Sequence, residues 1–225
     1  LHRNEQIPDL ITSGLPQVAI RVPGHPLTRQ LLSQLDFPVA APSANPFGYI
    51  SPTCAQHVED QLGAKVPYIL DGGACSVGLE STIVGVDEGH LVVYRKGGIA
   101  VERLREIDQN IVVRTHSDSN PSAPGMLKSH YAPTCPMRIV DQFSLIPEDE
   151  YADVGVISFS EVVNGVPEHQ QCILSPDRDY SEAARNLFKG MRRLDGLGLK
   201  MIYVGLLPEE DLGIAINDRL RRAAV

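Results

Sequence analysis

The sequence predicts an α/β protein, and three observations lead to that prediction. Short apolar runs that end at turn-forming residues alternate with segments whose apolar residues recur at helical spacing, which is the pattern of packed strands and helices. The composition then changes, and Ser, Asn, Pro and Gly accumulate at residues 117–125, as in a linker. Strand-like and helix-like segments alternate again from residue 137. We therefore expect a first domain at residues 1–108, a linker at 109–136 and a smaller α/β domain at 137–225.

The composition excludes several classes of protein. With 225 residues, of which 43% are hydrophobic and 21% charged, the chain is long and apolar enough to build a core. Its net charge of −8 argues against stable, non-specific nucleic-acid binding, which needs a basic face. No apolar run is long enough to cross a membrane, and no signal peptide is visible. The four cysteines form no CxxC pair, so we expect a cytoplasmic protein with reduced thiols and no metal site.

Each expected element of the first domain has its own sequence signal. The strands are apolar or β-branched runs that stop at a proline, a glycine or a polar turn, and the last two form a hairpin. Two of the helices carry an apolar stripe that we expect to be buried, and proline opens the first helix and the second. The expected strands are residues 17–23, 37–41, 68–71, 83–86 and 91–95, and the expected helices are 26–35, 52–62 and 99–107.

The second domain shows the same alternation. Its first helix has an apolar face that runs from Ala183 to Leu194, so it should pack on a sheet. No catalytic motif occurs in this domain. The expected strands are 137–140, 154–159, 172–174 and 200–206, and the expected helices are 180–194 and 214–224. The polar residues of the last helix are interpreted as a solvent-exposed face: Asn217, Asp218, Arg219, Arg221 and Arg222.

A loop rich in Pro, Ser and Asn joins the strand expected at 37–41 to the following helix. It contains Ser43 and Asn45 and ends at Thr53. Ligands of open α/β sheets collect at the carboxyl ends of strands, and the N–H groups of a helix N-terminus favour an anion. A capped turn has the same composition, so this segment alone supports a ligand loop and a plain turn equally. His57 in the helix is expected to be an ordinary surface histidine.

Two further segments contain residues suited to an anionic ligand. Arg21 lies in a β-branched run, where it either faces solvent or points at an anion. Ser81, Arg95 and Lys96 lie beside Gly-rich turns that suit phosphate or carboxylate binding. Such turns are more often only turns, so each of these signals is weak by itself.

The linker ends in a sequence that a simple spacer would not need. Residues 126–133 read Met-Leu-Lys-Ser-His-Tyr-Ala-Pro and mix Lys, His and Tyr with apolar residues. One interpretation is a linker that packs on a domain surface. The other is a lid whose His130 or Tyr131 contacts a ligand.

Several motifs occur together in one order along the chain. They are Arg21-Val22-Pro23, His25-Pro26, Ser43-Ala44-Asn45, Ser51-Pro52-Thr53, Leu79-Glu80-Ser81-Thr82, Tyr94-Arg95-Lys96-Gly97, Pro124-Gly125-Met126 and His130-Tyr131-Ala132-Pro133. No single motif is decisive, but in this order they resemble the YrdC-like threonylcarbamoyl-AMP synthase family in its two-domain form. The resemblance covers essentially the whole chain. It implies the carboxy-terminal part of a YrdC-like domain with a twisted mixed sheet, a linker, and a smaller Rossmann-like α/β domain.

The chain departs from the family pattern at its start. The Lys/Arg-containing motif and the strands that such proteins carry in their amino-terminal half have no counterpart here. We therefore expect a chain that starts midway through the catalytic domain and holds only part of the active site, which leaves open whether it is active alone.

The resemblance implies an enzyme, a nucleotidyltransferase that makes L-threonylcarbamoyladenylate from L-threonine, bicarbonate and ATP and releases pyrophosphate. Mg²⁺ is implied as the companion of ATP. A separate threonylcarbamoyl transferase complex, an indirect partner, would move the product's acyl group to tRNA. No catalytic residue or metal ligand is implied. Carried over motif by motif, the threonine-binding residues are Arg21, Ser43 and Ser81, and the ATP-binding residues are Asn45, Thr53, Arg95 and His130.

The alternative function is an RNA-binding or translation-factor-like YrdC module without catalysis. It predicts a basic concave surface, against which the net charge of −8 argues. A hydrogenase-maturation factor that shares the YrdC-like domain would carry acylphosphatase-like and zinc-finger segments, and this sequence shows neither.

Overall fold

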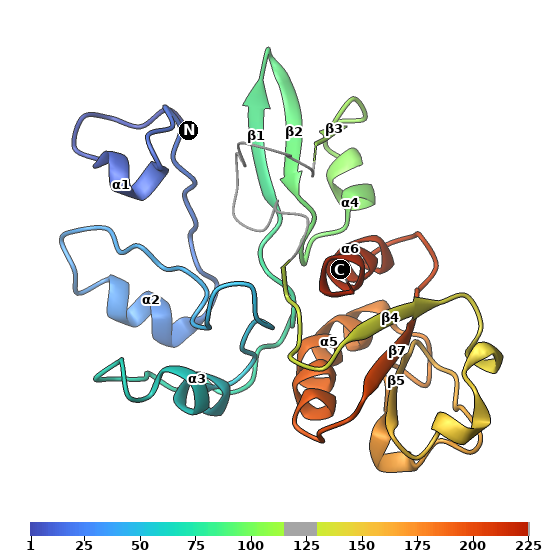
Figure 1. Cartoon of the computed structure of the whole chain (residues 1–225). Helices are drawn as coiled ribbons and strands as arrows, with labels where there is room; N and C mark the ends of the chain where they lie inside the picture. Colours follow the sequence, from blue (N-terminus) through green and yellow to red (C-terminus); the bar gives the residue numbers. More distant parts are fainter. Residues whose placement is uncertain (115–129, 225) are drawn as a thin grey trace.

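The computed structural model describes residues 1–114 and 130–224, which Figure 1 shows in colours that follow the sequence. The linker segment at 117–125 and residues 126–129 of the lid sequence lie outside these ranges. The fold is α/β, with a mixed three-stranded sheet and a parallel four-stranded sheet. Within the described ranges, no helix combines the length and apolarity needed to cross a membrane.

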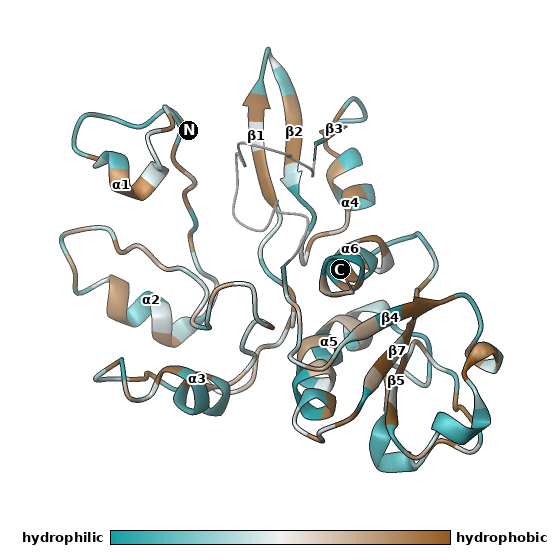
Figure 2. Ribbon diagram, in the orientation of Figure 1, coloured by the Kyte–Doolittle hydropathy of each residue, from teal (hydrophilic) through white to brown (hydrophobic). Residues whose placement is uncertain are grey.

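The four-stranded sheet has the order β4-β7-β5-β6, and all its neighbouring strands are parallel. Strands of a parallel sheet are covered on both faces and are therefore apolar along most of their length, as β5 and β7 are in Figure 2. The strands and helices expected in this region are confirmed. They are β4 (Met137–Val140), β5 (Val154–Ser158), β6 (Gln171–Ile173), β7 (Met201–Gly205), α5 (Tyr180–Asp195) and α6 (Gly213–Ala223), with the 3₁₀ turns η1 (Phe143–Leu145), η2 (Glu148–Glu150) and η3 (Glu168–Gln170).

Different elements cover the two faces of this sheet. Helices α5 and α6 cover one face, and the apolar side of α5 is buried from Ala183 to Leu194 as expected. The turn η1 and the loops around it cover the other face. Asp179 caps the N-terminus of α5, and its carboxylate accepts a hydrogen bond from the Glu182 N–H at 2.6 Å. This cap fixes the residue at which α5 begins. It thereby also fixes which side chains of the last turn point at neighbouring segments.

The three-stranded sheet is mixed. Strand β1 (Ile83–Asp87) pairs antiparallel with β2 (His90–Arg95), and β2 pairs parallel with β3 (Val112–Val113). Glu88 and Gly89 have φ values of 50° and 81°, which the tight turn between β1 and β2 requires. The expected hairpin is therefore confirmed. Strand β3 lies in a segment for which the sequence predicts linker, and the division at residue 108 stays a prediction.

The strands predicted at 17–23, 37–41 and 68–71 are wrong. These segments join neither sheet, and side chains such as Val22 and Tyr68 are 86% and 91% exposed. An apolar run becomes a strand only where a neighbour pairs with its N–H and C=O groups. The described residues provide these three segments with no more than one isolated bridge, which joins Gln17 to His2.

The remaining helices are short: α1 (Asp9–Thr12), α2 (Pro26–Leu32), α3 (Ala55–Leu62) and α4 (Val101–Arg105). The prediction that the leucine stripe of α2 is core is wrong, because that helix has no buried residue. Val101 of α4 is buried as expected, whereas Ile107, which follows the helix, is exposed. The main cores of the described residues are thus the two faces of the parallel sheet and a small cluster under β2.

The polar face of α6 is buried, which corrects the prediction of a solvent-exposed face. Asn217, Asp218, Arg219 and Arg222 are buried, whereas Arg221 is exposed as expected. Helix α6 lies between the parallel sheet and the base of the β1–β2 hairpin (Figure 1), so neighbours surround it. The sequence shows a polar face but cannot show that another part of the chain covers it.

Arg219 forms a buried ion pair with Glu80, which lies in the segment leading into β1. The Arg219 Nε and Nη2 atoms donate to Glu80 Oε2 at 3.1 and 3.0 Å, and Nη1 donates to Asp218 Oδ2 at 3.1 Å. Oε1 of Glu80 accepts a hydrogen bond from the Ser51 hydroxyl at 2.7 Å. Burial by itself raises the pKa of the Glu80 carboxyl, but Arg219 and Ser51 outweigh it and hold that pKa below its ordinary value. Glu80 is therefore ionised at neutral pH.

Gly78 lets the chain pass close to α5. Its φ is +79°, and a Cβ at this position would lie 2.3 Å from the Ala184 carbonyl oxygen. We predict that Gly78→Ala lowers the free energy of unfolding by roughly 2–5 kcal/mol, through left-handed strain and the clash together. Gly73→Ala is the matched control, because Gly73 has φ +84° but no atom within 4 Å of such a Cβ. If urea unfolding gives equal losses for the two variants, the close approach to α5 is not tight.

Removing one partner of the buried ion pair should cost much more than breaking an exposed pair. Arg219→Met leaves the Glu80 carboxylate buried without its cation and should cost about 3–5 kcal/mol of unfolding free energy. Arg221→Met breaks the exposed pair between Arg221 and Glu209 and should cost about 0–1 kcal/mol. Urea unfolding at pH 7 measures both losses, and similar values for the two variants would contradict a stabilising role for the buried pair.

The pH dependence of stability gives a second measurement of the same pair. Because folding lowers the pKa of Glu80, its contribution is complete above the unfolded pKa of about 4.3 and is lost as the pH falls through the lowered folded pKa. In Arg219→Met burial dominates and raises the pKa of Glu80, so we expect the stability difference between the unmodified protein and this variant to start shrinking above pH ~4.3 and to go on shrinking down to the lowered folded pKa. A difference that stays constant down to the acid transition would rule out the ionised pair as its cause.

Candidate functional site

Side-chain contacts hold the loop at residues 43–53, called the ligand loop from here on. Asn45 Nδ2 donates to the carbonyl oxygens of Pro46 and Tyr49, both at 2.9 Å. These two bonds identify the nitrogen end of the amide, so Oδ1 is the acceptor end. Among the described residues, Asn45 Oδ1 is buried and has no hydrogen-bond partner. A ligand with a donor group would satisfy this atom.

Thr53 lies at the other end of the ligand loop, just before α3. Its N–H donates to His57 Nδ1 at 3.1 Å, and its carbonyl accepts from the Cys75 N–H at 2.8 Å. His57 Nδ1 can accept this bond only while it is unprotonated. Burial, followed by the charge of Arg192, lowers the pKa of His57, so the ring is neutral at pH 7. The expectation of an ordinary surface histidine is therefore wrong, because His57 orders the Thr53 backbone.

His130 and Tyr131 have different surroundings. Tyr131 is 2% exposed and stacks on Phe188 with 5.4 Å between ring centroids, and the Arg219 guanidinium lies over the Tyr131 ring at 5.4 Å. His130 is half-buried and makes an edge contact with Phe47 of the ligand loop, with 6.1 Å between ring centroids. Tyr131 is thus a packing residue between α5 and α6, whereas His130 lies against the loop.

The His130 ring has a polar atom that its surroundings do not satisfy. His130 Nδ1 is buried without a hydrogen-bond partner among the described residues, as Asn45 Oδ1 is. Burial is the main cause that lowers the pKa of His130, and Glu80 opposes the shift. The ring is therefore neutral at pH 7, with an unpaired nitrogen next to the ligand loop.

Arg95 ends β2 and extends into the same neighbourhood. Its Nε donates to the Ser81 carbonyl at 3.0 Å. Burial lowers the pKa of the Arg95 guanidinium, and Glu80 opposes this shift. The positive charges of Arg219 and Arg21 lower the pKa further. A partly buried cation near two others would be stabilised by an anionic ligand.

The structure brings some of the predicted site residues together and leaves others apart. Ser81, Arg95 and His130 lie around the Glu80–Arg219 pair, and His130 contacts the ring of Phe47, two positions after Asn45 in the ligand loop. Thr53 joins this group through Ser51, which binds Glu80. Arg21, Ser43 and Ser81 are exposed, and no hydrogen bond among the described residues links the Ser43 side chain to the rest.

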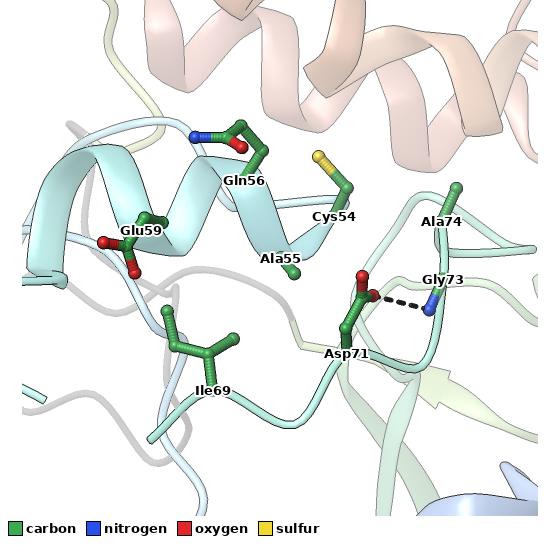
Figure 3. A pocket seen from close by; sticks show the side chains of 8 residues that line it. All are labelled: Cys54, Ala55, Gln56, Glu59, Ile69, Asp71, Gly73 and Ala74. Atoms are coloured by element: carbon green, nitrogen blue, oxygen red, sulfur yellow. Dashed lines mark hydrogen bonds between the residues drawn. The ribbon is translucent and has the colours of Figure 1, made fainter. Parts of the chain in front are cut away.

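A separate hollow of about 350 Å³ opens beside the first turn of α3, and Figure 3 shows it. Glu59 and Asp71 extend along it, and Asp71 Oδ1 accepts a hydrogen bond from the Gly73 N–H at 2.8 Å. Two carboxylates make this hollow unsuitable for a phosphate. None of the seven predicted site residues lines it. Its lining consists of Cys54, Ala55, Gln56, Glu59, Ile69, Asp71, Gly73 and Ala74.

Sequence reasoning missed the residues that hold the site in place. Glu80 lies inside one of the recognised motifs, between Leu79 and Ser81, and that position is the signal that could have identified it. Arg219 and Arg192 come from the second domain, where each looks like an ordinary polar residue of an amphipathic helix. No sequence pattern links such residues to a loop more than one hundred positions away.

Several known proteins and two family models are similar to this chain. Residues 99–225 match a family model described as "Threonylcarbamoyl-AMP synthase, C-terminal domain", and residues 1–97 match one described as "Telomere recombination". The threonylcarbamoyl-AMP synthase of Pyrococcus abyssi is 34% identical over 239 residues, an alignment that covers 100% of this chain and 68% of the relative. The synthase of Schizosaccharomyces pombe is 33% identical, with 98% of this chain and 60% of the relative covered.

A solved structure, described as the crystal structure of P. abyssi Sua5 complexed with L-threonine, has a TM-score of 0.88 and 33% identity to this chain. It covers 100% of this chain and 68% of its own. The chain thus spans between 60% and 68% of the length of these relatives. On this evidence the chain belongs to the threonylcarbamoyl-AMP synthase family.

Proposed function

We propose that this protein makes L-threonylcarbamoyladenylate from L-threonine, bicarbonate and ATP and releases pyrophosphate. The observation that carries the proposal is the match over the whole chain to the P. abyssi synthase, whose solved structure contains L-threonine. The threonine amine and bicarbonate give a carbamate with loss of water. A carbamate oxygen then attacks the α-phosphorus of ATP, the bond to the bridging oxygen breaks, and pyrophosphate leaves with the electron pair.

The nucleotide is assigned to Asn45, Thr53, Arg95 and His130. Asn45 Oδ1 is an acceptor, so its partner in a nucleotide is a donor such as a ribose hydroxyl. Arg95 supplies positive charge for the phosphates, and phosphoryl transfer depends mainly on such positioning and charge stabilisation. The unpaired Nδ1 of His130 supports a contact from the linker side.

Threonine is assigned to Arg21, Ser43 and Ser81. A guanidinium such as that of Arg21 can bind the threonine carboxylate with two hydrogen bonds, and serine hydroxyls suit a small polar side chain. The exposure of all three side chains is compatible with a small substrate that enters from solvent.

We assign the lid contact to His130 alone and a packing role to Tyr131. The dipeptide His-Tyr occurs once in this sequence, at residues 130–131. A P. abyssi variant in which a histidine and the tyrosine after it are both replaced by alanine has a solved structure with a TM-score of 0.88 to this chain. That variant changes two functions at once if the division between His130 and Tyr131 holds.

Mg²⁺ belongs to the proposal as the companion of ATP. Residues 1–114 and 130–224 contain no group of three or more His, Cys, Asp and Glu side chains that could hold a metal ion. Mg²⁺ is commonly bound by one or two carboxylates together with substrate phosphates, so it would be held mainly by the nucleotide. The product would serve a tRNA-modifying transferase complex, which places the proposed reaction in the cytoplasm.

The direct test is pyrophosphate release from ATP in the presence of threonine, bicarbonate and Mg²⁺. We expect release that requires both threonine and bicarbonate, with the P. abyssi synthase as positive control. Calorimetry with AMP runs in parallel. A chain that binds AMP without turnover would retain the nucleotide assignment and refute catalysis by this chain. Salt-sensitive tRNA binding without AMP binding would favour the RNA-binding alternative instead.

Single substitutions test the nucleotide assignment. Arg95→Gln should weaken AMP binding by about 1.5–3 kcal/mol, the range for a hydrogen bond to a charged group. His130→Ala should weaken it by about 0.5–1.5 kcal/mol, the range for a neutral hydrogen bond. Arg103→Gln is the control, because Arg103 is an exposed α4 residue paired with Glu106. If calorimetry gives the same AMP affinity for Arg95→Gln and Arg103→Gln, Arg95 is not in the site.

A further inference from the structure

The last turn of α5 contacts the ligand loop through one arginine. Arg192 Nε donates to the Ser51 carbonyl at 3.2 Å, and its Nη2 donates to the Ile50 carbonyl and, at 2.9 Å, to Gln61 Oε1 on α3. The guanidinium also lies over the Tyr49 ring, 5.1 Å from its centroid. A single side chain of the second domain thus binds both the middle of the ligand loop and the helix that follows it.

Asp195 lies one turn later on the same face of α5 and contacts the same loop. Its carboxylate accepts hydrogen bonds from the Tyr49 hydroxyl at 2.5 Å and from the Cys135 N–H at 2.7 Å. Burial, followed by the hydrogen bond to Asp195, raises the pKa of Tyr49 to about 12, so the hydroxyl keeps its proton and donates. Asp195 therefore connects Cys135, at the end of the linker, to Tyr49 of the ligand loop. The ring of the same Tyr49 lies under the Arg192 guanidinium.

These contacts fall between the two candidate nucleotide residues of the loop. Asn45 binds the Tyr49 carbonyl, and Thr53 follows Ser51 by two positions. The loop has no regular secondary structure, and the Ile50 and Ser51 carbonyls accept hydrogen bonds from Arg192, outside the loop. The planar guanidinium of arginine presents several donors in a fixed arrangement, which a lysine ammonium cannot copy.

We propose that Arg192, supported by Asp195, is a positioning residue for the nucleotide site. It holds the carbonyls of Ile50 and Ser51 so that Asn45 and Thr53 lie where a nucleotide can meet both. The second domain then shapes the site without touching the ligand. This inference rests on the proposed function for the identity of the ligand, but the hold on the loop can be measured without any ligand.

The experiment compares Arg192→Met and Arg192→Lys with Arg193→Met in the full chain. Arg193 is the matched control, because it is the next residue of α5 and donates to the carbonyls of His169 and Gln171 within the second domain. Amide hydrogen exchange, followed by mass spectrometry, measures the protection of residues 49–53 and of strands β5 and β7. Calorimetry measures the Kd of AMP.

We expect both Arg192 variants to lower the protection of residues 49–53 and to raise the Kd of AMP, each by roughly 10- to 100-fold, while β5 and β7 stay protected. Arg193→Met should leave the ligand loop and the Kd unchanged. Asp195→Asn, which keeps an acceptor oxygen for Tyr49, should have a smaller effect than Arg192→Met.

Two results would overturn the inference. One is an unchanged protection of residues 49–53 in Arg192→Met. The other is loss of protection in β5 and β7 to the same extent as in the loop, in both Arg192→Met and Arg192→Lys, which would make Arg192 a general stability residue. If the unmodified chain does not bind AMP, the proposed function fails, and the exchange data still decide whether Arg192 holds the loop.

Discussion

The buried contact between Glu80 and Arg219 determines how α6 meets the segment that leads into β1. Removing two charges from water costs several kcal/mol per ion, and their attraction compensates only when the remaining polar atoms are also paired. Here that condition is met, because Arg219 uses three donor atoms and the second oxygen of Glu80 binds Ser51. A small shift of either element would leave a buried charge without a partner. The pair therefore fixes a relative position that apolar packing alone would leave looser.

The candidate site lies where the two parts of the chain meet, which is a common place for ligand sites. Its polar atoms are carried by irregular segments, and the more regular second domain holds those segments in place. Tyr131 shows how this works at the linker. Its φ of +68° is unusual for a residue with a side chain, yet the stack on Phe188 and the cation over its ring keep it in place. The neighbouring His130 is thereby directed at the ligand loop.

The second domain could be predicted well from the sequence, because its strands and helices pack mainly on one another. The periodicity of the apolar residues from Ala183 to Leu194 predicts both the helix α5 and its buried face. The first part could not be predicted equally well. A segment such as 17–23 has the residues of a strand, but a strand also needs a neighbour, and a sequence pattern does not report one. The prediction of a solvent-exposed polar face on α6 was wrong for a related reason. Burial by another part of the chain leaves no periodic signal in the sequence.

The candidate site divides along the same line. The residues that could contact a ligand, such as Asn45 and Arg95, were identified through motifs that recur in one order. The residues that orient them, His57, Arg192 and Arg219, are polar residues of ordinary helices. They have a role because they lie close in space to segments that are distant in the sequence or irregular.

The length of chain between Glu80 and Arg219, 139 positions, has a consequence for biosynthesis. Ser51 and Glu80 are synthesised before α6. The Glu80 carboxylate can pair with Arg219 only after α6 has emerged from the ribosome. Domains generally fold as units during synthesis, with the amino-terminal part first. In this protein an early carboxylate is completed by a later helix, so the ligand loop reaches its final arrangement only after α6 has been made. A nascent chain would thus hold the binding residues of the loop well before it holds the binding site.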